Sequence, residues 1–375
     1  MKTGCQMKIT EIKTIKLQFE PTRNLRDGLA NIPTRDVLLV QVNTDAGISG
    51  IGEGFALGAL SLVATAVDEI LRPLLIGRDP TMIEEIWDLM YRHTFRYGRR
   101  GVMICAISAI DIALWDIFGK LLGQPVYKLL GGAKASVRPY ASAGYYMPGK
   151  GVEELVEEAR RYKESGFTVM KMKIAGATLK EDMQRIEAIK TAVGDEMQVA
   201  VDANSVYDFP SALKMGRFCE KLNIYFYEEP MSCDHIEDSI RLADALDIPI
   251  AGYESEVSRF GQRELISRHA VDILQLDTIW TGGISECKRL SGIASTWNKQ
   301  VIPHFSSSMV ALAANLQIAL SNTNTPIFEY TLDENPLRDE LCVNPIVMKD
   351  GLLHAPETPG IGVELNPDVV EKYKI

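Results

Sequence analysis

Several features that mark common classes of protein are missing from this chain of 375 residues. Its six cysteines are scattered and form no C-x-x-C pair, so we expect reduced thiols rather than a disulfide framework. No unbroken apolar run of about 18 residues occurs, which predicts that no helix spans a membrane. The N-terminus lacks the apolar segment of a signal peptide. These absences predict a cytoplasmic protein with no membrane partner.

Positive charge is also in short supply. The formal net charge is −10, from 40 Lys and Arg against 50 Asp and Glu. This balance argues against a general nucleic-acid or anionic-membrane surface. The apolar content of 46% and the charged content of 24% are ordinary for a globular protein with a large core. An anionic substrate would therefore have to be attracted by local positive charge.

One segment could supply that charge. Residues 168–174 read T-V-M-K-M-K-I and alternate like a β-strand, with Lys171 and Lys173 on one face and large apolar groups on the other. One interpretation is an edge strand whose lysines face water and discourage edge pairing. The alternative is a strand that presents both lysines to a functional site, and the residues that follow favour it.

Each of the next strands along the chain ends at an ionisable residue. These residues are separated by about one strand–helix unit each: Asp202, Glu228, Glu254, Asp277, His304 and Glu329. The carboxyl ends of consecutive strands meet at one mouth of a parallel barrel, which is where such barrels carry their chemistry. We therefore expect these side chains to converge.

The order of elements predicts two domains. Strands followed by helical segments over 1–130 form an α+β pattern. Over 131–343, eight short strands that alternate with helices favour a parallel (β/α) barrel over a doubly wound open sheet. The tail, 344–375, is expected to return to the first domain.

The polar segment 19–31 predicts a mobile lid. It contains Arg23 and Arg26 in a chain that is otherwise net negative. We expect it to close over the mouth of the barrel, with at least one arginine binding the distal hydroxyls or a second carboxylate of the substrate. A solvated loop without such a role is the alternative.

The acids Asp202, Glu228 and Glu254 would repel one another if they were buried without counter-charge. A hard divalent cation resolves this, and Mg²⁺ prefers about six oxygen ligands. The thiolates or paired histidines that zinc prefers do not accompany them. The spacing favours one Mg²⁺ per site, with Mn²⁺ as a possible substitute, over three unrelated surface acids.

Asp277 and His304 end neighbouring strands and are well placed to touch. The carboxylate would fix the imidazole tautomer and raise its basicity, although a purely structural role is the alternative for the histidine alone. Glu329 offers a hydrogen bond on the same side. If Lys171 lowers the pKa of Lys173, this set suits removal of the proton α to a carboxylate, because cation, lysine and acid all stabilise the enediolate charge.

The motifs that carry these residues resemble the enolase superfamily, mandelate racemase subgroup, over nearly the whole chain. They are K-M-K (171–173), D-A-N (202–204), Y-E-E-P (227–230), G-Y-E (252–254), L-D (276–277), P-H (303–304) and F-E-Y (328–330). The resemblance implies a capping domain over a modified barrel, (β/α)7β, and an essential Mg²⁺. The roles it implies are metal ligands at Asp202, Glu228 and Glu254, opposed acid/base groups at Lys173 and the His304–Asp277 dyad, and an enolate hydrogen-bond donor at Glu329. We also expect Lys171 and Asn204 to contact the substrate.

In this subgroup, bases on both faces of the α-carbon suit either a racemase or epimerase, or a dehydratase that forms a 2-keto-3-deoxy acid. The pattern resembles acid-sugar dehydratases most, and we predict a hydro-lyase acting on an aldonate or aldarate. Muconate-lactonizing and dipeptide-epimerase relatives carry a lysine where this chain has Asp277, which disfavours a cycloisomerase. A non-catalytic relative would be expected to have lost a ligand or a base, and none is missing. We expect a small carboxylate as substrate and a homo-oligomer, a dimer or an octamer.

Overall fold

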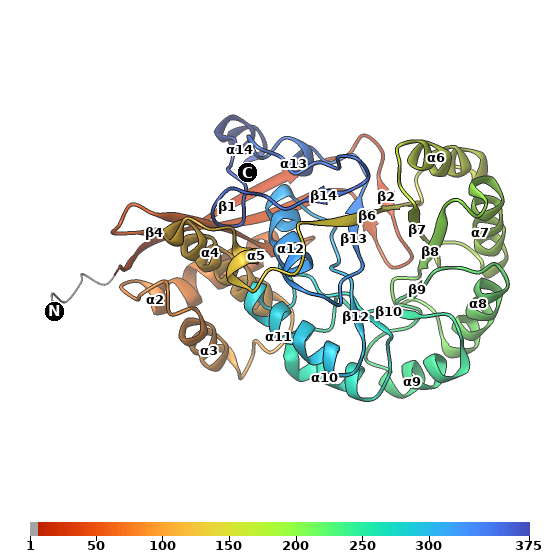
Figure 1. Ribbon diagram of the computed structural model, residues 1–375, viewed down its shortest axis with the longest axis horizontal. Helices are drawn as coiled ribbons and strands as arrows, with labels where there is room; N and C mark the ends of the chain where they lie inside the picture. The colour runs from red at the N-terminus through yellow and green to blue at the C-terminus, as the bar shows by residue number, and fades with distance from the viewer. Residues whose placement is uncertain (1–6) are drawn as a thin grey trace.

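The computed structural model describes residues 7–375, so Cys5 lies outside the described residues. A capping domain built from the N-terminal part of the chain lies beside a barrel built from the rest (Figure 1). The five described cysteines are free thiols, and all but Cys233 are buried. This agrees with the expectation of reduced thiols over the described range.

The capping domain contains a three-stranded antiparallel sheet in the order β1–β4–β5. Its strands are β1 (Ile9–Phe19), β4 (Arg35–Thr44) and β5 (Ser49–Phe55). Asp45, Ala46 and Gly47 form the tight turn between β4 and β5, where Gly47 adopts a positive φ of 75°. The helical elements that follow are α1 (Leu60–Thr65), the π-helix η1 (Ala66–Leu71), α2 (Arg72–Leu75), α3 (Ile83–Thr94), α4 (Val102–Leu122) and α5 (Val126–Leu129).

Helix α4 is the most apolar long helix among the described residues, and it is part of the protein core. It is long and apolar enough to cross a membrane by length and composition, and 83% of its most apolar window is buried inside the protein. Its two acids show why it is a core helix. Asp111 accepts hydrogen bonds from the backbone N–H and the hydroxyl of Ser285, at 2.9 and 2.6 Å. Asp116 accepts one from the N–H of Ile51 at 3.0 Å, so the helix is tied to both domains.

The barrel has eight parallel strands in the order β12–β11–β10–β9–β8–β7–β6–β13. They are β6 (Ser136–Ala143), β7 (Val169–Lys173), β8 (Gln198–Asp202), β9 (Tyr227–Glu228), β10 (Ile250–Gly252), β11 (Ile273–Leu274), β12 (Gln300–Val301) and β13 (Ile327–Thr331). A helix of at least 10 residues follows each strand except the last: α6 (Val152–Glu164), α7 (Leu179–Val193), α8 (Phe209–Lys221), α9 (Ile236–Ala245), α10 (Ser258–Ser267), α11 (Gly283–Thr296) and α12 (Met309–Ser321). This is the (β/α)7β order.

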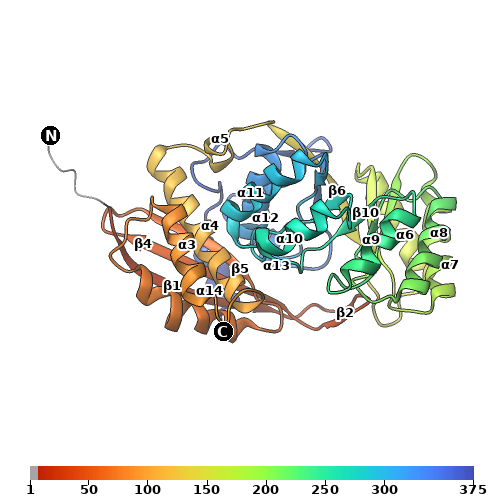
Figure 2. The ribbon, with the colours of Figure 1, turned by 90° about the horizontal axis from the view of Figure 1, so that it is seen from below.

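The helices surround the strands, and the capping domain covers only part of this ring. In Figures 1 and 2, α6 to α9 lie on the side away from the cap, whereas α10, α11 and α12 lie toward α3 and α4. Helix starts follow local rules. Thr178 and Glu181 form a reciprocal capping box at the start of α7, and Ser308 caps α12 through its hydroxyl.

Strand β7 is an interior strand, paired with β6 on one side and β8 on the other. This excludes the edge-strand interpretation of its lysines. Val169 belongs to a cluster of apolar residues contributed by many of the barrel strands, whereas Met170 and Met172 belong to the large cluster that includes the helices. Lys171 and Lys173 share the face of Val169, so the period-two pattern places both inside the barrel.

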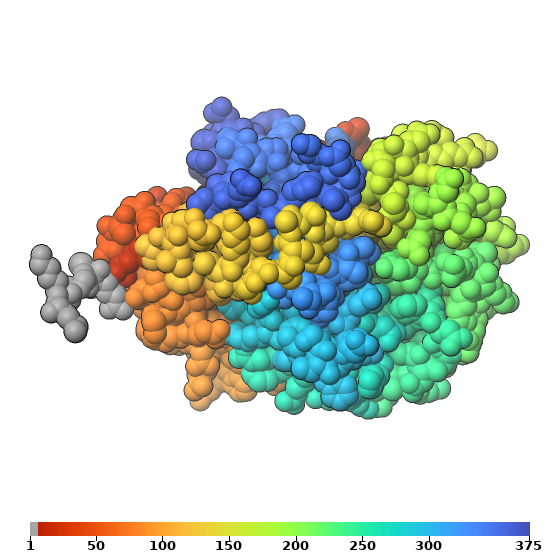
Figure 3. Space-filling view, in the orientation of Figure 1, coloured from red at the N-terminus to blue at the C-terminus, as the bar shows by residue number. Residues whose placement is uncertain are grey.

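The tail contacts both domains. Strand β14 (Leu353–His354) pairs antiparallel with β6, and α14 (Pro367–Tyr373) packs on β1, where the ring of Tyr373 meets that of Phe19 edge-on. Figure 3 shows the blue tail running beside the yellow segment near residue 130, and the N–H of Val126 donates to the carbonyl of Gly360 at 2.9 Å. The remaining short helix is α13 (Pro336–Asp339).

The segment 19–31 is more ordered than a plain loop. Strand β2 (Leu25–Arg26) pairs with β3 (Asn31–Ile32) to form a short hairpin. The backbone of Arg26 exchanges two hydrogen bonds of 2.9 Å with that of Tyr146, directly after β6. The hairpin is therefore fastened to the barrel rim.

Candidate active site

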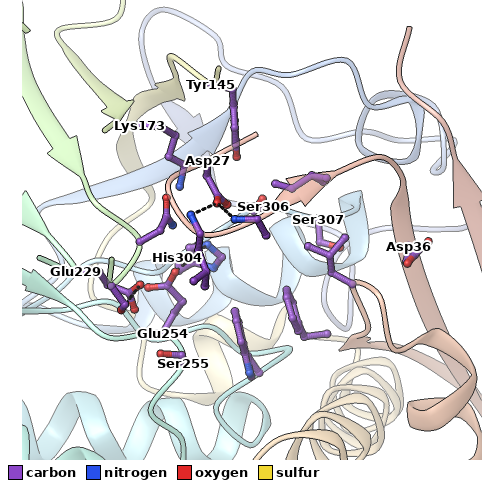
Figure 4. A pocket seen from close by; sticks show the side chains of 18 of the residues that line it. Asp27, Asp36, Tyr145, Lys173, Glu229, Glu254, Ser255, His304, Ser306 and Ser307 are labelled. Atoms are coloured by element: carbon purple, nitrogen blue, oxygen red, sulfur yellow. Dashed lines mark hydrogen bonds and ion pairs between the residues drawn. The ribbon is translucent and has the colours of Figure 1, made fainter. Parts of the chain in front are cut away.

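A cavity of about 600 Å³ opens where the carboxyl ends of the barrel strands face the capping domain. Lys173 and His304 both reach it, from the second and the seventh strand of the barrel, and Glu254 and Glu229 lie below them (Figure 4). Asp27, from the hairpin of the capping domain, lies over the same space. The cavity is thus enclosed by both domains.

The two lysines of β7 are buried and paired with the predicted metal ligands. Lys173 Nζ lies 2.5 Å from Asp202 Oδ2. Lys171 Nζ lies 2.5 Å from Glu228 Oε1 and 2.6 Å from Glu329 Oε1. Burial would lower the pKa of each lysine, but the facing carboxylates outweigh it, and the pKa of both is raised. Lys171 does lower the pKa of Lys173, as expected, but the opposite charge of Asp202 outweighs this effect, so the net pKa of Lys173 is raised where a lowered value was expected.

The acids of the site are crowded and only partly neutralised. Burial, with Asp202 next in effect, raises the pKa of Glu228 well above its ordinary value. Burial and the neighbouring Glu254 do the same for Glu229. One oxygen of Glu254 and one of Glu229 are buried without a hydrogen-bond partner. Buried carboxylate oxygens without partners are suited to binding a cation.

The residue types fit Mg²⁺, although the side chains do not surround a common point as they stand. Among residues 7–375, no three His, Cys, Asp or Glu side chains are arranged to hold a metal ion. Lys173 and Lys171 form ion pairs with one oxygen each of Asp202 and Glu228. Gln275 donates a hydrogen bond to the other oxygen of Glu228, Oε2, at 2.5 Å. The free oxygen of Glu254 and the excess of buried acid match a hard divalent cation, and side-chain rotation would release the lysines.

The predicted dyad is formed. His304 Nδ1 lies 2.8 Å from Asp277 Oδ2, and Asn315 Nδ2 donates to Asp277 Oδ1 at 2.9 Å. His304 Nε2 lies 3.8 Å from Glu254 Oε1. Burial would lower the pKa of His304, but the charge of Glu254, followed by Glu329 and Asp277, outweighs it and raises the pKa to about 9.

Glu329 lies between the lysines of β7 and the loop that carries His304. Its Oε1 contacts Lys171, and its Oε2 accepts a hydrogen bond of 3.0 Å from the N–H of Phe305. Burial would raise its pKa, but the charges of Lys171 and His304 lower it. The carboxyl group is therefore ionised here, and donation to an enolate would require that it first gain a proton.

The remaining predicted substrate contacts divide into two kinds. Asn204 lines the cavity, and its N–H donates to Asp202 Oδ1 at 2.8 Å. Arg23 and Arg26 do not line the cavity. Arg23 pairs with the exposed Glu154 at 2.5 Å, and Arg26 donates to the carbonyl of Gly176 at 2.7 Å. Both arginines reach barrel elements outside the cavity in this structure, and their contact with a substrate stays a prediction.

Sequence reasoning missed several cavity residues. Arg35, Tyr145, Trp280 and Ser306 all line the cavity. Tyr145, Trp280 and Ser306 come within a few residues of the ends of β6, β11 and β12, so continuing each strand-end motif into its loop would have found them. Arg35 could not be found in this way, because it begins strand β4 of the capping domain and follows no barrel strand. It is buried against Asp333, 2.5 Å away, on a distant part of the chain.

Comparisons with known proteins agree with this architecture. Residues 14–131 match the model of the mandelate racemase / muconate lactonizing enzyme N-terminal domain, and residues 154–369 match that of the enolase C-terminal domain-like family. The chain is 42% identical over 371 residues to an arabinonate dehydratase of Saccharolobus solfataricus, covering 98% of this chain and 99% of that protein. It is 32% identical to a D-galactarolactone cycloisomerase of Agrobacterium fabrum, covering 98% and 99%.

Solved structures give the same result. The crystal structure of the 3,6-anhydro-D-galactonate cycloisomerase from Zobellia galactanivorans superposes with a TM-score of 0.90 at 35% identity, covering 98% of this chain and 99% of that one. A protein described as a mandelate racemase candidate from Bordetella bronchiseptica gives 0.94 at 31% identity, covering 98% and 95%. The chain is a member of the enolase superfamily, in its mandelate racemase / muconate lactonizing enzyme group.

Proposed function

We propose that this protein is a Mg²⁺-dependent acid-sugar dehydratase, which removes water from an aldonate or aldarate to form a 2-keto-3-deoxy acid. The observation that carries the proposal is that Lys173 and His304 reach one cavity from the second and the seventh barrel strand. A substrate between them would have its α-proton near one group and its β-hydroxyl near the other.

The residues divide the reaction between them. Lys173, once deprotonated, takes the α-proton, and the electrons of that C–H bond become delocalised over the carboxylate. His304 gives a proton to the β-hydroxyl as the C–O bond breaks, so that water leaves and an enol forms, which tautomerises to the keto acid. Asp277 stabilises the imidazolium and holds its orientation. Lys171 and Glu329 lie deeper in the barrel and bind the carboxylate end.

We assign one Mg²⁺ to Asp202, Glu228 and Glu254, with Mn²⁺ as a substitute. When bound, the cation supplies positive charge that balances these acids and stabilises the negative charge developing on the substrate carboxylate. The cluster of buried acids and the free oxygen of Glu254 support this assignment.

Among acid sugars, we favour an aldonate of five or six carbons. The relative named arabinonate dehydratase aligns over nearly the full length of both chains at 42% identity. Two relatives named cycloisomerases align at 32% and 35% identity. The second candidate function is therefore ring opening of a lactone or an anhydro sugar. Both reactions begin with loss of the α-proton. They differ in the group that leaves afterwards, which is water in the dehydratase and a ring oxygen in the cycloisomerase.

The test is a substrate screen. Purified protein with Mg²⁺ is incubated with aldonates, aldarates and their lactones, arabinonate first, and 2-keto acid is measured with semicarbazide. Keto acid from an open-chain acid supports the dehydratase. Interconversion of α-epimers in D₂O without keto acid would replace it with a racemase, and product from lactones alone would replace it with a cycloisomerase. Light scattering on the same sample measures the assembly, which we predict to be a dimer or an octamer.

A further inference from the structure

The segment 50–54, G-I-G-E-G, forms the middle of β5 and takes no part in the chemistry described above. Its three glycines face α4 so closely that an added Cβ would lie 2.0–2.6 Å from backbone carbonyl oxygens of that helix. Side chains alternate along a strand, so Glu53 points to the other face of β5, away from α4. The glycines thus allow the close packing that brings Glu53 to the barrel.

Glu53 is fully buried against the start of α12. Its Oε1 accepts a hydrogen bond from the hydroxyl of Ser307, and its Oε2 accepts one from the hydroxyl of Ser308. The N–H of Ala311 also donates to Oε2, at 3.1 Å. Ser307 lines the cavity close to His304 in the chain (Figure 4). One carboxylate of the capping domain therefore fixes the loop that begins at His304.

Phe55 extends the same contact to the other half of the dyad. Its N–H donates to the carbonyl of Ile279 at 2.9 Å, and its ring stacks on Trp280 at 3.7 Å between centroids. Trp280 in turn meets the ring of His304 edge-on at 6.4 Å. Ile279 and Trp280 lie two and three residues after Asp277 in the chain. Strand β5 therefore holds the two loops that carry Asp277 and His304.

We propose that Glu53 is a positioning residue, which keeps His304 aligned with Asp277 and with the cavity. Glu53 itself does not line the cavity, so it acts through Ser307 and Ser308. A displacement of about 1 Å in a reacting group can reduce a rate by ~10²-fold. The turnover part of the test rests on the proposed function, because it assumes that His304 is an acid/base group.

The test compares two buried carboxylates of the capping domain. Glu53→Gln keeps the side-chain volume but replaces one acceptor oxygen with a donor, and we expect kcat to fall by ~10–100-fold with KM changed by less than ~3-fold. The control is Asp111→Asn, because Asp111 also contacts the start of a barrel helix, through Ser285, but neither residue lines the cavity. We expect a similar loss of thermal midpoint in both variants and a normal kcat in the control.

A second measurement separates positioning from general damage. In a His304→Asn background, Glu53→Gln should cause no further loss of the residual exchange of the α-proton with deuterium. In protein labelled with ¹⁵N-histidine, the His304 signals, identified by their absence in His304→Asn, should shift in Glu53→Gln and stay in place in Asp111→Asn. Unchanged signals, an unchanged kcat, or an equal loss in the His304→Asn background would each overturn the proposal. If the wild type forms no keto acid, the proposed function fails, and the histidine signals alone decide the role of Glu53.

Discussion

The two halves of the barrel mouth are held in place in different ways. On the half formed by β7 to β10, charged residues of the barrel strands hold one another: Lys173 pairs with Asp202 on the adjacent strand β8, and Lys171 pairs with Glu228 on β9. On the half formed by β11 to β13, the Asp277 and His304 loops contact the capping domain through β5. The lysine half is therefore arranged by the barrel itself, whereas the histidine half depends on contacts between domains.

This difference follows from where the cap lies. Helices α6 to α9 surround the lysine half away from the cap, and α10 to α12 lie toward it (Figure 2). In the lysine half the ion pairs join residues of the barrel strands themselves, so the barrel alone brings the partners together. In the histidine half the loops are supported by the remote strand β5 of the capping domain.

The largest effect should come from removing the cation from the lysine half. Excess EDTA, or Glu228→Gln, should reduce keto acid formation to background, because no bound cation would then stabilise the negative charge that develops on the substrate carboxylate. In a thermal shift assay, Mg²⁺ at 100 times its Kd should stabilise the wild type by ~2.7 kcal/mol and should not stabilise Glu228→Gln to that extent. Full turnover in EDTA would remove the metal assignment.

The next effect concerns the base. Lys173→Ala should lower kcat by ~10³-fold, since general base catalysis contributes on that scale. The matched control is Lys299→Ala. Lys299 is also largely buried and pairs with an aspartate, Asp272, at 3.1 Å, but at the opposite end of the barrel strands. Turnover should remain normal in the control, and wild-type deuterium exchange in Lys173→Ala would refute the role of Lys173.

His304→Asn tests whether the two halves can be separated chemically. With Lys173 intact, the variant should still exchange the α-proton with deuterium, while keto acid formation falls by ~10²-fold or more. Exchange is followed by NMR and keto acid by semicarbazide. Equal loss of both would show that the histidine, rather than the lysine, removes the α-proton.

The smallest effect should come from the contacts between the cap and the lysine half. The double variant Arg23→Ala and Arg26→Ala should change kcat/KM by less than ~3-fold, because neither side chain lines the cavity. Asp27→Asn, in the same hairpin but over the cavity, should raise KM by about tenfold, the effect of ~1.4 kcal/mol of lost binding. A large loss in the arginine variant would restore their predicted substrate contact and imply a different closed conformation.

The sequence by itself determined the barrel and the strand ends, and it predicted most residues of the candidate site. Period-two alternation in β7 and the even spacing of Asp202, Glu228, Glu254, Asp277 and His304 are local properties of the chain, and parallel strand ends necessarily converge. The same information could not show which atoms pair. In the structure the lysines contact the acids, so the pKa of Lys173 is raised where the sequence led us to expect a lowered value.

Only the tertiary structure decided what supports the dyad and what the capping hairpin contacts. Glu53 meets Ser308 across more than 250 residues, and Arg23 meets Glu154 across 131. Such partners share no periodicity or motif, because their contact depends on how the capping domain and the barrel pack against each other. The glycines of β5 carried a signal of close approach, but the helix they approach, and hence the direction of Glu53, became visible only when both domains were in place.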